Sequence, residues 1–276
     1  CFTPAEVADV NEKTTAFYAQ LNFGGTNAEV LGVPYSGNIG VRYVNTDLLS
    51  SGGLSLPTPF EAHELECRDV APPPGLPEGA PYVQKSIGCY LSGDDIAFAN
   101  GATPLGNVKV KHDHWLPSFN LKLDPTDNFV IRYAWSTAIS RPDMGNLRNY
   151  VSVSNDTPDS SNPDDSLWVK DANGNITGAT IYYSGKAHNP YLKPIEAKQH
   201  DLSFEYYWSA VGSASVAFFR KDFDNYIQSG TYNRTFVNNG VTRTAEITGP
   251  VNGDGASLQG FEVAFQTFFD FLPSPW

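Results

Sequence analysis

The segment FVIRYAWS, residues 129–136, decides the class of fold. Its residues Phe129, Ile131, Tyr133 and Trp135 stand at every second position, and the residues between them are smaller or polar. A two-residue period places alternate side chains on opposite faces of a β-strand. The segment therefore predicts a strand with one apolar face and one more polar face.

The same period recurs along the chain. Further strands are expected within residues 15–23, 38–43, 118–123, 202–208 and 261–269. A seventh strand over 214–223 is less regular, because the adjacent Phe218 and Phe219 put aromatic rings on both faces. Helical periodicity is weak by comparison, so the chain is predicted to be all-β.

The apolar parity changes inside one predicted strand. Val108 and Val110 are even-numbered, whereas Phe119 is odd-numbered. A β-bulge shifts parity by one residue. We therefore expect a bulge or an irregular stretch near Pro117.

The connections between the strands alternate in length. Along the chain they are 24–35 (short), 51–106 (long), 124–128 (short), 140–195 (long), 209–213 (short) and 230–256 (intermediate). Long structureless loops are uncommon in compact soluble domains. Outer-membrane barrels alternate short periplasmic turns with long extracellular loops. The rhythm therefore favours an antiparallel transmembrane β-barrel wall.

Aromatic residues cluster beside the short connections. Phe23, Phe129, Trp208 and the run 268–271 lie there. Membrane barrels carry aromatic girdles at their interfaces. The pattern predicts a periplasmic girdle, with ordinary strand-end aromatics of a β-sandwich as the alternative.

Composition narrows the function classes. The chain has 276 residues and a formal net charge of −12, with 13% aromatic and 17% charged residues. An acidic chain offers no basic surface to nucleic acid, so no nucleic-acid partner is expected. Outer-membrane lipid is expected as a partner, although a secreted carbohydrate-binding sandwich would have a similar composition.

The chain contains three cysteines. Cys67 and Cys89 lie in one Pro-rich irregular stretch, which predicts a loop disulfide in an oxidising compartment. Cys1 is then left without an assigned partner. Acylation of Cys1, as in a lipoprotein, is the alternative use for it.

Six motifs in order resemble the β-barrel region of TonB-dependent receptors, in particular the subgroup described from Caulobacter and Xanthomonas relatives. They are SGNIGVRYVNT (36–46), WLPSFNL (115–121), RYAWS with SRPD (132–143), NPYLKP with DLSFEYY (189–207), FRKDFDNYI (219–227) and GFE (260–262). Each is weak alone, but together they cover most of the chain.

The resemblance implies a 22-stranded barrel with an N-terminal plug, of which about seven strands are present here. Nothing in the chain resembles the plug or the TonB box, and LPSPW at 272–276 resembles a periplasmic turn. We therefore expect residues 1–276 to be one partial barrel domain, internal to a longer protein. The resemblance further implies a bacterial outer-membrane location and coupling to the TonB–ExbB–ExbD complex through the plug.

Polar residues alternate with the apolar ones on the predicted strands. The expected lumen-facing set is Arg42, Asn120, Lys122, Arg132, Glu205, Glu262 and Gln266. Some of them could contact the plug or a passing substrate. A water-filled interior by itself also requires polar side chains, and for any one residue this simpler explanation is preferred.

The long connection within 150–188 combines acidic and aromatic residues. Trp168, Asp164, Asp165, Tyr182 and Tyr183 are the predicted substrate-binding residues. A solvated loop would have the same composition. The stretch 171–175 begins like a calcium-binding EF-hand loop, but the glycine and glutamate that such a loop needs are absent, so a hairpin turn is expected.

Motifs for catalysis or cofactor binding are not found. His112 and His114 share one strand face without enough further ligands, so no metal site is expected. The sequence also lacks a nucleophile elbow, a P-loop and a GxGxxG motif, so we expect no enzyme activity and no cofactor.

The leading hypothesis is active import of a bulky nutrient, an oligosaccharide or else a siderophore. A secreted all-β carbohydrate-binding or carbohydrate-active domain is the first alternative, and a passive porin is the second. The packing of Phe129, Ile131, Tyr133 and Trp135 distinguishes them, because a sandwich would bury these side chains against a second sheet.

Overall fold

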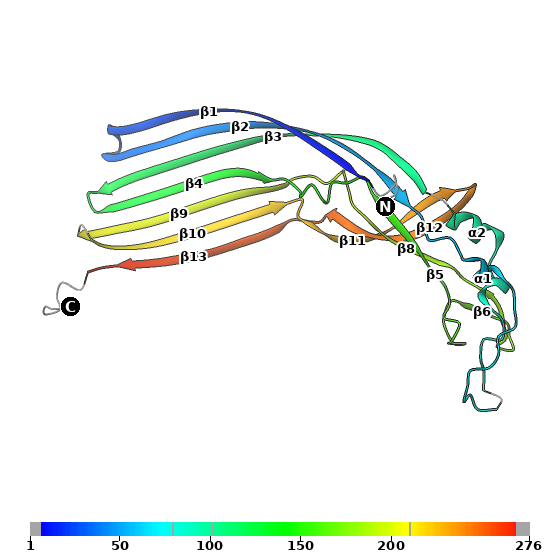
Figure 1. The fold of residues 1–276 in the computed structure, drawn as a ribbon. Helices are drawn as coiled ribbons and strands as arrows, with labels where there is room; N and C mark the ends of the chain where they lie inside the picture. Colours follow the sequence, from blue (N-terminus) through cyan, green and yellow to red (C-terminus); the bar gives the residue numbers. More distant parts are fainter. Residues whose placement is uncertain (1–6, 79, 101, 210, 269–276) are drawn as a thin grey trace.

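The computed structural model describes residues 7–78, 80–100, 102–209 and 211–268. Its main feature is a curved antiparallel sheet, here called the wall, whose strands run side by side (Figure 1). In sheet order the wall strands are β1 (Asp9–Val30), β2 (Val33–Ser55), β3 (Ala102–Thr126), β4 (Phe129–Ser140), β9 (Ile195–Ser209), β10 (Gly212–Asp224) and β13 (Ala256–Gln266). The predicted all-β barrel wall is thereby confirmed.

The short connections of the wall gather at one end (Figure 1). β1 and β2 pair as far as Val30 and Val33, so their link is Leu31 and Gly32 rather than the expected 24–35. Both residues have positive φ, 51° and 76°, which is the backbone of a type I′ hairpin turn. The expected link 124–128 likewise narrows to Asp127 and Asn128.

The long connections fold together at the other end of the wall, in a region here called the cap (Figure 1). Its strands β5 (Val151–Asp156), β8 (Tyr182–Ala187), β11 (Ile227–Asn238) and β12 (Val241–Asn252) extend the main sheet in the order β11-β12-β8-β5-β2. β1 pairs with β2 only up to Ser51, and β5 then pairs in parallel with Leu54 and Ser55. The cap is therefore continuous with the wall.

The remaining elements of the cap are short. They are α1 (Ala62–Leu65), η2 (Ile87–Cys89), α2 (Gly93–Ala99), β6 (Trp168–Lys170) and β7 (Ile176–Ala179). The long connections over 51–106 and 140–195 therefore contain secondary structure of their own, and 230–256 is mainly the β11–β12 hairpin. These segments fold because they share a buried apolar cluster that includes Phe98, Val151, Phe236 and Ile247.

The side chains of the wall divide into two faces. We call the face with Phe17, Ile131 and Phe218 the outer face, and the opposite one the inner face. Outer-face side chains meet across strands, as Phe218 does with Phe261. Large apolar groups stay exposed there, with Phe17 at 68% and Phe261 at 69%. Within the described residues, no second sheet packs on this face.

The parity change near Pro117 has a different cause from the one expected. β3 pairs with β2 without a shift from Leu123 to Asn107, so the predicted bulge is absent and that prediction was wrong. Towards the cap the apolar side chains of β2 and β3 lie on the inner face, where Leu48 packs with Leu147 and Leu192 and Val110 packs against this cluster. The apolar side chains therefore change faces while the strand stays regular.

Pro117 instead marks a change of partner. Pairing of β3 with β4 ends at Ser118, whereas pairing with β2 continues past Pro117. A proline has no N–H to donate to a neighbouring strand, which suits the end of a ladder.

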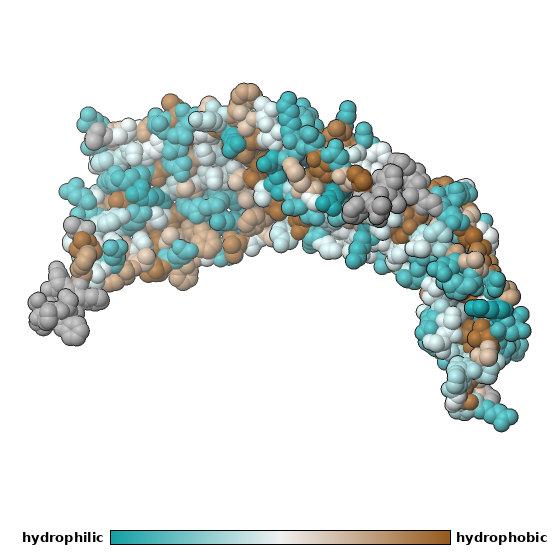
Figure 2. Space-filling view, in the orientation of Figure 1, coloured by the Kyte–Doolittle hydropathy of each residue, from teal (hydrophilic) through white to brown (hydrophobic). Residues whose placement is uncertain are grey.

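The space-filling view shows hydrophobic residues along the lower left margin of the wall, over β10 and β13 (Figure 2). Among the described helices, none has the length and apolar character needed to span a membrane.

Candidate functional site

The inner face of the wall carries a band of polar side chains. Arg42, Asn120, Lys122, Arg132, Glu205, Glu262 and Gln266, the residues predicted to face a lumen, all have inner-face register. They come from five strands that are far apart in sequence. Strand alternation therefore brings together a polar set that no local motif defines.

Ion pairs and hydrogen bonds order part of this band. Arg132 lies 3.0 Å from the carboxylate of Glu205, which also accepts hydrogen bonds from Ser203 and from Tyr207. Lys122 lies 2.8 Å from Asp124. Lys122 and Asp124 share β3, whereas the Arg132–Glu205 pair joins β4 to β9 and favours the register that holds the apolar residues on the outer face.

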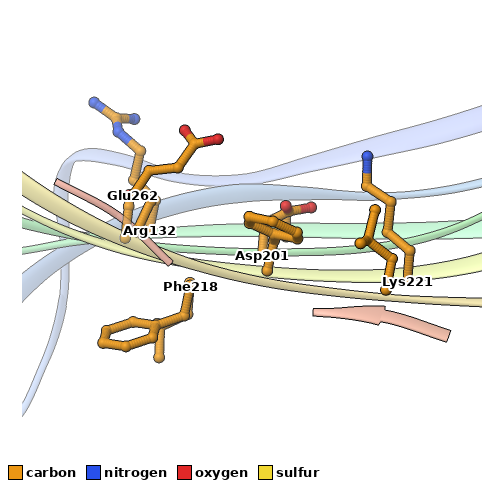
Figure 3. Close-up of a pocket in the computed structure, with 11 residues that line it drawn as sticks. Arg132, Asp201, Phe218, Lys221 and Glu262 are labelled. Carbon is orange, nitrogen blue, oxygen red and sulfur yellow. The ribbon is translucent and has the colours of Figure 1, made fainter. Parts of the chain in front are cut away.

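A shallow hollow of about 470 Å³ lies on the inner face between β4, β9, β10 and β13. Arg132, Asp201, Lys221 and Glu262 project to one side of the sheet there, and Phe218 projects to the other (Figure 3). The hollow thus presents two cations and two carboxylates. A mixed-charge surface of this kind suits contact with polar protein or with hydrated solute.

Phe218 and Phe219 make the strand pattern of β10 irregular, and the position of Phe219 explains this irregularity. It has inner-face register opposite Gly260 of β13. A Cβ on Gly260 would lie 2.7 Å from the Phe219 ring, so the missing side chain leaves room for the ring. A ring laid over a strand glycine stabilises the pair, which explains why both faces of β10 carry aromatics.

The outer face has an aromatic row at each end of its apolar band. Near the turns, Phe23 stacks on Phe119, with 6.1 Å between ring centroids, and Trp208 stacks on Phe265 at 5.3 Å. Phe129 and Trp208 lie beside the short turns as predicted, whereas Phe23 lies eight residues before the β1–β2 turn at Leu31 and Gly32. Phe269–Phe271, together with Cys1 and the expected turn at 272–276, lie outside the described residues.

A second aromatic row, which the sequence analysis missed, lies towards the cap. The rings of Tyr43 and Trp115 lie there, with 4.9 Å between their centroids. The strand parity that placed the first row also places this one. Polar outer-face residues follow it, beginning with Asn45 and Asp113.

The junction between wall and cap is tied on the inner face. Arg141 pairs with Glu12 and donates to the Thr14 hydroxyl at 2.9 Å, although Arg141 and Thr14 are 127 residues apart in sequence. His112 and His114 lie in this region with inner-face register, and Nε2 of each is buried without a hydrogen-bond partner in the part of the chain that the structure describes. Among the described residues no group of three potential metal ligands is found.

The cap is held by a polar contact between α2 and the sheet. The carboxylate of Asp95 lies 3.1 Å from Arg243 Nη2 and 3.4 Å from the Tyr183 hydroxyl. Burial raises the pKa of Asp95, but hydrogen bonds from Ser92 and Arg243 outweigh it, so the pKa lies below the ordinary value. Burial, together with the Asp95 charge, raises the pKa of Tyr183 to about 12.

The acidic segment of the cap is organised around a β-hairpin. β6 and β7 pair on either side of residues 171–175, so the predicted hairpin turn is confirmed. Hydrogen bonds from the side chain and backbone N–H of Asn175 hold the pKa of Asp171 below its usual value. Backbone N–H donors from Ser161 and Asp159 likewise lower the pKa of Asp159 and Asp165. These carboxylates therefore stay charged and available at the surface.

The five residues predicted to bind substrate have different surroundings. Trp168 is 5% exposed, packs edge-on against Tyr90 and donates its indole N–H to backbone oxygens. Tyr183 is 3% exposed and packs against Phe98. Both rings thus have structural roles. Asp164, Asp165 and Tyr182 remain accessible to differing degrees, with Tyr182 41% exposed.

A disulfide joins Cys67 and Cys89 across the Pro-rich stretch of the cap. The bridge ties η2 to the chain just after α1, and the Ser86 hydroxyl donates to the backbone oxygen of Glu66 at 2.7 Å beside it. Covalent closure stabilises a segment that has few apolar residues of its own.

A single antiparallel sheet with an apolar, ring-bordered outer face and a polar inner face has the construction of a transmembrane β-barrel wall. The sequence model described as "TonB dependent receptor-like, beta-barrel" matches residues 3–275. The chain therefore belongs to the TonB-dependent receptor β-barrel family, as the resemblance predicted.

Two solved receptor structures are similar to this chain. The hemophore receptor HasR of Serratia marcescens, solved with its hemophore HasA and heme, has a TM-score of 0.51 and 13% identity, and the match covers 92% of this chain and 31% of HasR. The siderophore receptor PirA of Acinetobacter baumannii has a TM-score of 0.40 and 16% identity, over 93% of this chain and 34% of PirA. The chain thus spans about a third of these proteins. A search of curated proteins finds no significant match.

Proposed function

We propose that this chain forms part of an outer-membrane receptor for TonB-energised uptake of a bulky nutrient. The observation that carries the proposal is the pairing of an exposed apolar outer face with an ordered polar inner face in one sheet. Lipid would cover the outer face, and the inner face would border a hydrated lumen.

The two aromatic rows support a position across the membrane. Tyr35 and Tyr43 of β2 both have outer-face register, and eight residues of strand span about 26 Å. An apolar band of roughly 25 Å is typical of outer-membrane barrels. The turn end then lies in the periplasm and the cap lies outside the cell.

The charge of the cap bears on the class of nutrient. Residues 56–100 contain seven acidic and two basic residues, and residues 150–188 contain five acidic and two basic residues. An acidic entrance repels multiply charged anions and tolerates neutral ligands. We therefore favour a neutral oligosaccharide over an anionic ferric siderophore, although similar structures include receptors for siderophores and for a heme-carrying hemophore.

Import, in this proposal, needs no covalent chemistry and no cofactor in the wall. Residues 1–276 act as one barrel domain, and a plug elsewhere in the protein couples to the TonB–ExbB–ExbD complex. The inner-face ion pairs, such as Arg132 with Glu205, would then contact the plug or the hydrated path.

The experiment is uptake in a strain lacking the full-length protein. Complemented cells should take up labelled neutral oligosaccharide. The triple change Asp164→Asn, Asp165→Asn and Tyr182→Ala should weaken binding of that oligosaccharide. Ser166→Ala on the same segment is the matched control. Equal uptake by deleted and complemented cells would refute import, and uptake of ferric siderophore instead would refute the nutrient class.

The alternatives make different predictions. A passive porin would keep its uptake after TonB is removed or the proton gradient is collapsed. A secreted carbohydrate-binding sandwich would bury residues such as Phe17 and Phe261, which are 68% and 69% exposed. Cell fractionation would also place such a protein outside the membrane.

A further inference from the structure

A basic patch lies on the outer face just beyond the aromatic row nearest the cap. Lys13, Asp47 and Lys111 stand opposite one another on β1, β2 and β3, and Lys109 lies two residues further along β3. These residues border a hollow of about 310 Å³ together with Asn11 and Leu49. Neighbouring residues across a sheet lie about 5 Å apart at Cβ, so the three ammonium groups can converge on one small ligand.

The charges of this patch are not neutralised within the described residues. None of Lys13, Lys109 and Lys111 lies within 4.0 Å of a carboxylate there, whereas the outer-face cations Lys198 and Arg220 pair with Asp224 and Asp222. Of the described residues that line the hollow, Asp47 alone carries a carboxylate. In a chain of net charge −12, an excess of three lysines over one aspartate is a local exception.

The nearest other carboxylate lies one row closer to the apolar band. Asp113 accepts a hydrogen bond from the Tyr43 hydroxyl and another from the Asn45 amide, both at 2.7 Å. Two donors therefore already satisfy this carboxylate, and Lys111 lies farther than 4.0 Å from it. The lysines remain the groups that an external anion would meet.

The position of the patch relative to the membrane indicates the class of its ligand. Asp47 lies four residues beyond Tyr43 on β2, about 13 Å along the strand. A strand tilt of about 40° reduces this rise to about 10 Å, at the outer edge of the headgroup layer, and the long Lys side chains can reach back to the headgroups. Lys side chains at this depth attract anionic headgroups.

We infer that Lys13, Lys109 and Lys111 bind the phosphate of an anionic lipid headgroup in the outer leaflet. The inference rests on the outer-membrane position proposed above. The exposed Leu49 and the row of Tyr43 and Trp115 would contact the acyl and sugar portions of the same lipid. Such a lipid would hold the β1–β3 edge of the wall at a fixed depth in the membrane.

Native mass spectrometry of the full-length protein tests the inference, with diphosphorylated lipid A as the probe. The triple change Lys13→Gln, Lys109→Gln and Lys111→Gln should weaken retention of lipid A by about fivefold for each lysine, or roughly 100-fold in all. The matched control is Lys170→Gln, Lys186→Gln and Lys198→Gln, which changes the net charge equally away from the patch. The corresponding Lys→Arg triple should retain lipid A.

Two further arms identify the ligand. On the wild-type protein, lipid A stripped of its phosphates should be retained roughly 100-fold more weakly than diphosphorylated lipid A, and this arm needs no mutant to fold. Inorganic phosphate at the same concentration should not displace lipid A. Equal retention in the glutamine and control triples, or displacement by free phosphate, would overturn the inference, even if nutrient uptake were intact. If nutrient uptake were absent while retention of lipid A still depended on the three lysines, only the proposed function would be overturned.

Discussion

Arg243 on β12 donates a hydrogen bond to Asp95 on α2 at 3.1 Å, across 148 residues of sequence. The two side chains are 27% and 15% exposed, so the ion pair is partly shielded from water. Tyr183 of β8 adds its hydroxyl at 3.4 Å. One carboxylate thus connects the first long connection of the chain to the second and the third.

Arg243→Ala should loosen the cap and leave the wall intact. Removing the cation leaves a partly buried carboxylate without its partner, which costs about 1–3 kcal/mol. Hydrogen exchange should increase in α2 and β12 and stay unchanged in β9 and β10. Lys170→Ala is the control, because its partner Asp164 is 80% exposed and the loss should be small. Equal effects from both changes would contradict this role of Arg243.

The cap should also lose stability in alkali through Tyr183. Its pKa is about 12 in the folded protein and 10 when unperturbed, so the unfolded state ionises first as the pH rises. The stabilisation is complete below pH 10 and is lost between 10 and about 12. Denaturation of the cap followed at several pH values should show this loss in the wild-type protein. Tyr183→Phe should flatten the dependence of cap stability on pH over that range. An unchanged slope in the variant would be evidence against the role of Tyr183.

The wall could be predicted from the sequence because lipid and water impose a two-residue period on its strands. Phe129, Ile131 and Tyr133 carry that pattern in one short segment, and the strand register follows from it. The pattern misled us only where the environment changes. At Leu48 and Val110 the buried side is the inner face, and a change of environment has the same parity signature as a bulge.

The cap could not be predicted, because its order depends on pairings between distant segments. β5 adds to β2 in parallel, and β8 joins β12 in parallel, with no local turn to indicate either pairing. Trp168 and Tyr183 illustrate the consequence for the site. An aromatic residue in a polar connection has the same sequence signature whether it binds a ligand or fills a small core, and here both rings are buried.

Reduction of the disulfide should release one part of the cap. Cys67 and Cys89 close a loop with a sequence separation of 22 residues, for which the loss of chain entropy stabilises the folded state by about 3 kcal/mol. Limited proteolysis of the reduced protein, or of Cys67→Ser with Cys89→Ser, should cut within residues 66–90 first. The β11–β12 hairpin should remain protected, because Phe236 and Ile247 are buried in the shared core. Simultaneous loss of both regions would mean that the bridge holds the entire cap.

Adjacent residues of β10 provide the most direct test of the two faces. Val216 has outer-face register between Phe204 and Val263, in the middle of the apolar band, whereas Ala217 has inner-face register opposite Glu262. Val216→Lys should cost about 2–4 kcal/mol, the penalty for a lysine at the bilayer midplane of a barrel. Ala217→Lys introduces the same side chain beside a carboxylate and in contact with water, so it should be tolerated. Urea unfolding in lipid bilayers measures the difference, and heat-dependent mobility on gels measures the folded fraction in outer membranes. Equal destabilisation by the two lysines would mean that the outer face does not contact lipid, because only an apolar surrounding separates positions that are adjacent in sequence.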